Sequence, residues 1–160
     1  MGNSKLYQDK FPPIDKYSQP MIVAYSVFSG IPRIADEIKR VKKWIEDNGY
    51  TIIYPPITVY YDDPSEVGHD KCKCEVQWPI GEKIAEFEDN IGIKEVPVMR
   101  VLSVIHKGPY NKIFEAYNFL FEIINKEELT VTEAPREIYI GDCYNTPEEK
   151  IVTEVQWPIQ

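Results

Sequence analysis

The sequence has too little positive charge for a typical nucleic-acid-binding protein. It carries 18 Lys and Arg against 26 Asp and Glu, a formal net charge of −8. Its only basic cluster, IKRVKK at residues 38–43, is best interpreted as the solvated side of a helix. Because binding to a phosphate backbone needs a basic face, we expect no direct nucleic-acid binding. An acidic protein is a better host for cations.

Long apolar runs are also missing. No stretch of about 18 apolar residues is present, so no membrane span is expected. The first residues, MGNSKLYQDKFPP, lack the apolar core of a signal peptide. We therefore expect a cytoplasmic protein whose residues 1–13 form a loose arm.

Cysteine and histidine are scarce. The three cysteines cannot all pair within the chain, which favours reduced thiols in a cytoplasm. The segment HDKCKC places His69 close to Cys72 and Cys74, but the spacing matches no standard zinc site and Cys143 is distant. We expect no metal and no cofactor. We also expect no haem, since His69 and His106 lie outside the strands that we expect to line a ligand cleft.

The sequence contains one hexapeptide twice. EVQWPI occupies residues 75–80 and again 154–159, a separation of 79 residues, and a chance match of this length is improbable. Further pairs follow at 79 residues, and others at 78 upstream of an insertion near Asn111: Pro56 and Pro135, Tyr60 and Tyr139, Met21 and Met99, Gly30 and Gly108. We interpret residues 1–160 as one domain of two repeats, about 20–80 and 99–159, joined by an acidic connector, 81–98.

Each repeat has the pattern strand, helix, strand, strand. The first repeat predicts a strand at 21–30, a helix within 31–50 that stops at Asn48-Gly49, and strands in 51–56, 57–64 and 72–80. The second predicts a strand at 98–108, a helix within 109–128, and strands in 129–135, 136–142 and 150–159. These elements predict an α+β fold with helices on one face of an antiparallel sheet. Two copies suggest pseudo-two-fold symmetry, with a ligand cleft on the axis.

Alternation along the strands indicates which side chains share a face. In REIYIGD (136–142) we expect Ile138 and Ile140 to face the helices, and Glu137 and Tyr139 to share the other face. The equivalent residues of the first repeat are Thr58 and Tyr60, so only one repeat carries the carboxylate. This asymmetry favours a single functional centre. The alternative, a solvated Glu and ordinary tyrosine packing, stays open at this point.

The repeated hexapeptide alternates in the same way. Val76, Trp78 and Ile80 share one face, and Val155, Trp157 and Ile159 repeat the pattern. Alternating apolar positions usually mark the buried side of a sheet. We therefore expect core positions, while Trp78 and Trp157 remain candidates for the wall of the cleft.

The chain resembles the GyrI-like small-molecule-binding family, whose domain also serves as the effector-binding domain of multidrug-responsive transcription regulators. Three segments between residues 14 and 159 carry the resemblance: HKGPYNKIFEAYNFLFEII, APREIYIGD and TEVQWPI. They are similar to the family's Gly-Pro-Tyr before a helix, its Glu-x-Tyr strand, and its closing Thr-Glu-x-Gln-x-Pro strand. The first repeat departs from this pattern, with SGIPRI in place of Gly-Pro-Tyr.

The resemblance implies binding of lipophilic, often cationic aromatic compounds around a central glutamate. By motif that residue is Glu137, with Tyr139 and Tyr110 beside it. Because few residues precede the repeats, we expect a stand-alone form of the domain that senses or sequesters drugs or toxins.

Two alternatives follow from the same resemblance. One is hydrolysis of strained cyclopropane-type compounds, with Glu137 as general base. The other is a protein-interaction module of gyrase-inhibitor type that uses the acidic connector around residues 82–89. In addition, we expect the substitution Glu137→Gln to leave thermal stability unchanged or to raise it, because an unpaired buried carboxylate costs stability.

Overall fold

The computed structural model describes residues 12–82, 90–142 and 145–160. The chain divides into two compact units. The first-repeat unit comprises residues 19–98, and the second-repeat unit comprises the described part of residues 1–18 together with residues 99–160. The expected loose arm lies almost entirely outside the described residues.

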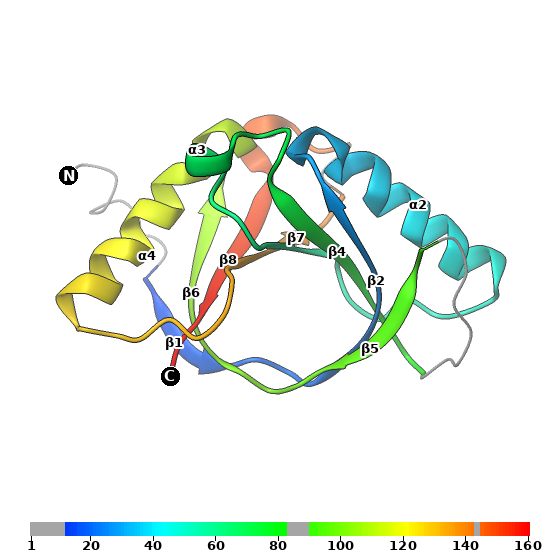
Figure 1. The fold of residues 1–160 in the computed structure, drawn as a ribbon, viewed down its shortest axis with the longest axis horizontal. Coiled ribbons are helices and arrows are strands. Elements are labelled where there is room, and N and C mark those ends of the chain that lie inside the picture. The colour runs from blue at the N-terminus through cyan, green and yellow to red at the C-terminus, as the bar shows by residue number, and fades with distance from the viewer. Residues whose placement is uncertain (1–11, 83–89, 143–144) are drawn as a thin grey trace. The chain divides into compact units, whose positions relative to one another are not determined.

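The first-repeat unit contains a four-stranded antiparallel sheet. Its strand order is β3-β4-β2-β5, and helix α2 packs on β4 and β2 (Figure 1). The elements are β2 (Met21–Ser29), a 3-10 turn (Ile31–Arg33), α2 (Ile34–Asp47), β3 (Ile57–Tyr60), a short helix α3 (Pro64–Val67), β4 (Lys73–Ile80) and β5 (Gly92–Val96).

The second-repeat unit is built in the same way. Its strand order is β1-β6-β8-β7, also antiparallel, and α4 packs on β6 and β8 (Figure 1). The elements are β1 (Ile14–Tyr17), β6 (Arg100–Lys107), a 3-10 turn (Tyr110–Lys112), α4 (Phe114–Lys126), β7 (Arg136–Ile140), a 3-10 turn (Glu148–Lys150) and β8 (Val152–Pro158).

The edge strands are exchanged between the repeats. Strand β1 precedes the first repeat in sequence but pairs with β6 of the second, while β5 precedes the second repeat and pairs with β2 of the first. The registers are equivalent, since Lys16 lies opposite Val101 and Lys94 lies opposite Val23. Each unit therefore depends on a strand contributed from outside its own repeat.

The local sequence explains where the helices begin and end. Pro32 lies in the first turn before α2, where its missing N–H is not needed. At the other end, the Asn48 side chain donates to the Trp44 carbonyl at 2.8 Å and Gly49 adopts φ +75°. This ending is the one predicted from Asn48-Gly49.

The α+β fold with helices on one face of antiparallel sheet is confirmed. Two predicted strands are wrong: segments 51–56 and 129–135 each form only a single bridge, Ile52 with Ile80 and Val131 with Ile159. Prolines follow both bridges, and proline cannot donate to a ladder. Within the described residues, no helix combines the length and hydropathy needed to cross a bilayer.

Candidate functional site: a buried carboxylate among aromatic rings

Glu137 and Tyr139 lie on the face of the sheet that α4 covers. Glu137 is opposite Val155 and Tyr139 is opposite Thr153 in the β7–β8 register, and Val155 belongs to the core cluster under α4. Directly paired residues point to the same side of a sheet. The prediction that Ile138 and Ile140 face the helix is therefore wrong, because they share the opposite face with Glu154.

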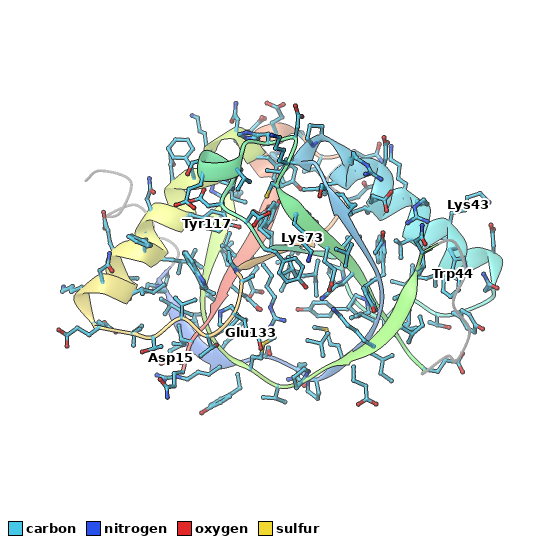
Figure 2. All side chains as sticks on the ribbon, in the orientation of Figure 1. Asp15, Lys43, Trp44, Lys73, Tyr117 and Glu133 are labelled. Atoms are coloured by element: carbon cyan, nitrogen blue, oxygen red, sulfur yellow. The ribbon has the colours of Figure 1, made fainter. Side chains whose placement is uncertain are left out.

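Two tyrosine hydroxyls hold the carboxylate of Glu137. Tyr117 on α4 donates to Oε2 at 2.6 Å, and Tyr139 on β7 donates to Oε1 at 3.2 Å. Glu137 is only 4% exposed. Hydrogen bonds to an ionised acceptor are strong, so these contacts offset part of the cost of burying the carboxylate. Figure 2 labels Tyr117 on α4.

Aromatic rings surround this carboxylate. Tyr110 packs edge-on against Tyr139 at 5.7 Å between ring centroids, and Tyr117 packs edge-on against Trp157 at 6.3 Å. Phe121, one turn further along α4, also lies 6.3 Å from Trp157. We call Glu137 and these five rings the aromatic site.

Part of the aromatic site is open to solvent although its carboxylate is buried. Phe121 is 54% exposed and Tyr110 is 38% exposed. In addition, Thr153 Oγ1 and Trp157 Nε1 are buried without a hydrogen-bond partner among the described residues. Exposed apolar side chains that gather in one place mark candidate binding surfaces.

Tyr117 is not among the residues that the sequence predicted for the site. Its spacing with Leu120 and Ile124 on the helix predicts a core position. The available signal was the hydroxyl, because a tyrosine in a buried stripe needs a polar partner.

The corresponding residues of the first repeat form a different environment. Thr58 is fully buried and its Oγ1 has no partner among the described residues, while Tyr60 is partly buried. Trp78 donates from Nε1 to the Ile38 carbonyl at 2.9 Å, and the Lys42 ammonium lies 5.9 Å from its ring centroid. Trp78 thus packs under α2. Four of the predicted site residues come together in the second-repeat unit: Glu137, Tyr139, Tyr110 and Trp157.

The glutamates of EVQWPI lie on the sheet face away from the helices. Lys94 pairs with Glu75 at 2.7 Å, and Lys16 pairs with Glu154 at 2.8 Å. Gln77 and Gln156 each donate to their glutamate at 2.6 Å. The repeated hexapeptide therefore builds the same buried Lys–Glu–Gln network in both units.

Burial and hydrogen bonding act in opposite directions on Glu154. Burial alone would raise its pKa, but hydrogen bonds from Gln156, Lys16 and Ser103 outweigh burial and lower the pKa of this carboxyl. Glu154 is therefore held in its charged form by the surrounding donors.

The cysteines form no metal site within the described residues. Cys72 and Cys74 are buried, with their sulfurs 3.9 Å apart, and burial raises the pKa of the Cys72 thiol. His69 is exposed. No group of three His, Cys, Asp or Glu side chains in this part of the chain is placed to hold a metal. Cys143 and residues 83–89 of the acidic connector lie outside the described residues.

Solved structures resemble the chain in fold at low sequence identity. EcmrR in a DNA complex superposes with a TM-score of 0.84 at 22% identity, over 99% of this chain but only 63% of EcmrR. The EcmrR C-terminal domain gives 0.81 at 23% identity, covering 94% of this chain and 98% of that domain. The chain thus spans less than two thirds of the EcmrR chain in the DNA complex.

Two other structures share the fold. A hydrolase from Listeria innocua gives a TM-score of 0.71 at 12% identity, covering 92% of this chain and 91% of that one. SAV2435 bound to tetraphenylphosphonium gives 0.56 at 11% identity, covering 94% of each chain. None of the curated proteins matches the chain. Residues 16–160 match the GyrI-like small molecule binding domain, and the chain therefore belongs to this family of small-molecule-binding domains.

Proposed function

We propose that the aromatic site binds a lipophilic aromatic cation, for sensing or sequestration of a drug or toxin. The observation that carries this proposal is the environment of Glu137, a carboxylate 4% exposed with phenol donors on both oxygens and partly exposed rings beside it. A flat or propeller-shaped cation would stack on the rings while its charge offsets that of the carboxylate.

The energetics favour a cation over a neutral or anionic compound. A buried carboxylate retains a desolvation cost that phenol donors remove only in part. A cation at about 5 Å gains about 3 kcal/mol at an effective dielectric constant of 20. Each cation–π contact adds about 0.5–2 kcal/mol. An anion of the same shape would lack this Coulomb attraction and would instead be repelled by the carboxylate.

The family and one neighbour support this ligand class. The chain belongs to a small-molecule-binding family, and the structure of SAV2435 is bound to tetraphenylphosphonium, a lipophilic aromatic cation. At 11% identity that neighbour shares the fold alone, so the local geometry of Glu137 carries the argument. The net charge of −8 for the whole chain favours cations over nucleic acid as partners.

A matched pair of probes tests the proposal. Tetraphenylphosphonium and tetraphenylborate have the same shape and opposite charge, and calorimetric titration of both gives their affinities. We expect the wild type to prefer the phosphonium at least about tenfold, and Glu137→Gln to remove most of that preference. Glu133→Gln is the control, because Glu133 is exposed and the substitution changes the net charge equally. Figure 2 labels Glu133 before β7.

Equal preference in wild type and Glu137→Gln would show that Glu137 does not recognise the charge. Thermal melts of the same proteins separate binding from folding. The structure changes our sequence-based expectation here, because Glu137 has two hydroxyl donors. The side-chain oxygen of a glutamine can still accept one of these two hydrogen bonds. We therefore expect Glu137→Gln to lower the free energy of unfolding by about 1 kcal/mol or less.

Hydrolysis is a second candidate. The favouring observation is the hydrogen bond of 2.6 Å between Tyr117 and Glu137, which places a potential general acid beside a potential general base. Incubation with a cyclopropane-bearing alkylator and mass spectrometry would detect a product with water added. Product in excess of protein would establish turnover, whereas loss limited to one equivalent would identify binding or capture.

A further inference from the structure

The carbonyl of Pro109 receives two hydrogen bonds. The Lys112 amide donates to it at 3.1 Å, which closes the 3-10 turn before α4. The His106 ring nitrogen Nε2 lies 3.1 Å from the same oxygen. Since a carbonyl can only accept, His106 donates through Nε2–H, and both lone pairs of the Pro109 oxygen are used.

His106 lies in the floor of the aromatic site, so the expectation that this residue lies outside the strands of the site is wrong. His106 is 2% exposed and pairs with Thr153 across β6 and β8, and Thr153 pairs with Tyr139 across β8 and β7. The three side chains therefore form one row on the face that α4 covers. The turn at residues 108–110 folds back over the His106 end of this row.

The turn has limited conformational freedom of its own. Gly108 adopts φ +133°, and its amide donates to the Ile151 carbonyl at 2.8 Å. A Cβ at Gly108 would lie 3.9 Å from His106 Nε2, so the backbone passes close over the imidazole. Tyr110 follows immediately, and its ring packs edge-on against Tyr139.

The first repeat lacks this arrangement. Phe28 occupies the position equivalent to His106, and the segment Gly30-Ile31-Pro32 replaces Gly108-Pro109-Tyr110. The Arg33 guanidinium lies over the Phe28 ring, 5.5 Å from its centroid. The histidine and the tyrosine therefore occur together in one repeat and are absent together from the other.

We propose that His106 is a positioning residue for ligand binding. Through Pro109 it fixes the turn that holds Tyr110 against Tyr139, so that the Tyr110 ring forms one wall of the aromatic site. His106 itself does not touch the ligand. This inference rests on the proposed function, and it predicts that the effect of His106 on binding passes through the Tyr110 ring.

A double-mutant cycle tests this coupling. The affinity for tetraphenylphosphonium is measured for His106→Phe and His106→Gln, each with Tyr110 intact and with Tyr110→Ala. Phenylalanine keeps a buried ring and is the residue of the first repeat, whereas glutamine keeps an N–H donor. With Tyr110 intact we expect His106→Phe to weaken binding about threefold to tenfold, within the range of one cation–π contact. We expect His106→Gln to retain most of the wild-type affinity for tetraphenylphosphonium.

In the Tyr110→Ala background, both His106 substitutions should have little further effect. Equal losses in the two backgrounds, or a glutamine variant as weak as the phenylalanine variant, would overturn the inference. If His106→Phe fails to fold, His106→Leu against His106→Gln provides the same comparison. Wild-type affinity in all His106 variants together with a strong loss in Glu137→Gln would refute this inference and leave the proposed function standing.

Discussion

The two repeats agree on one face of their sheets and differ on the other. Away from the helices, each unit pairs a lysine of an exchanged edge strand with the glutamate of EVQWPI, at 2.7 Å for Lys94–Glu75 and 2.8 Å for Lys16–Glu154. The glutamine two residues later donates to that glutamate in both units. This face serves the same structural purpose twice, because it fixes the edge strand in register.

Under the helices the repeats have different chemistry. In the second-repeat unit, Val104, Ala116 and Phe119 belong to an apolar core. At the equivalent positions of the first-repeat unit, Ser26 and Arg40 both bond to the buried Glu37. Conversely, Glu137 and Tyr117 of the aromatic site correspond to Thr58 and Ile38. A duplicated scaffold thus supports a charged cluster in one copy and an aromatic site in the other.

The largest expected effect comes from breaking the feature that the repeats share. Lys16→Met and Lys94→Met each leave a buried glutamate without its cation. Breaking a fully buried pair costs about 3–5 kcal/mol. The side chains of Lys16 and Lys94 are 39% and 35% exposed, so we expect about 2–3 kcal/mol for each. Urea unfolding measures both.

The exposed pair of Lys42 and Glu46, 3.8 Å apart, provides the control, and Lys42→Met should cost less than about 1 kcal/mol. Losses that differ by more than about 2 kcal/mol between Lys16→Met and Lys94→Met would show that the two networks are not equivalent.

The next effect concerns the charged cluster of the first repeat. Glu37→Ala removes the carboxylate that accepts hydrogen bonds from Ser26 and Arg40. It should lower the free energy of unfolding by about 2 kcal/mol, because polar groups near the core lose their hydrogen-bond partner. Introducing the second repeat's residues together, as Ser26→Val, Glu37→Ala and Arg40→Phe, should recover that loss. Thermal or urea unfolding of the single and triple variants decides the question. A triple variant less stable than Glu37→Ala would mean that the cluster is required by this unit's packing.

A smaller effect is expected when the aromatic site is made to resemble the first repeat. Tyr117→Ile replaces the residue with its counterpart, Ile38, and removes both the donor to Glu137 and the ring beside Trp157. We expect tetraphenylphosphonium to bind about tenfold more weakly. Tyr117→Phe, which keeps the ring, should lie between Tyr117→Ile and wild type in the same titration. Unchanged affinity in Tyr117→Ile would exclude this side of α4 from the site.

The smallest effect is a difference in acid sensitivity. Because the pKa of Glu154 is lowered in the folded protein, its stabilising contribution is present above the ordinary carboxyl value of 4.5 and is lost as the pH falls through the folded pKa. Stability measured from pH 7 to pH 3 should therefore fall less steeply in Glu154→Gln than in wild type. Parallel curves would indicate that Lys16, Ser103 and Gln156 do not hold the carboxylate charged.

Much of the fold followed from sequence patterns that depend on local physics. Helical spacing predicted α2 and α4, and the caps at Asn48-Gly49 predicted where α2 ends. The hexapeptide repeat indicated two equivalent closing strands, β4 and β8, and the structure gives them equivalent registers. The exchange of β1 and β5 was not predicted. Lys16 and Lys94 are 78 residues apart, so extending the repeat upstream would have indicated two equivalent strands, but only the pairings in the structure show which sheet each one joins.

The sequence by itself determined which side chains share a face, and only the tertiary structure decided which face the helix covers. Alternation places Glu137 with Tyr139 and Ile138 with Ile140. It does not indicate which pair faces the helix when Glu137 and Ile138 are both buried. Glu137 is 4% exposed and Ile138 is 2% exposed, so polarity could not distinguish the two sides. The hydroxyl of Tyr117 and the carbonyl of Pro109 reach the site from outside the strand that carries Glu137. Tyr117 is 20 residues from Glu137 in the sequence, and Pro109 contacts His106 across a turn. Contacts of this kind are set by packing rather than by sequence periodicity.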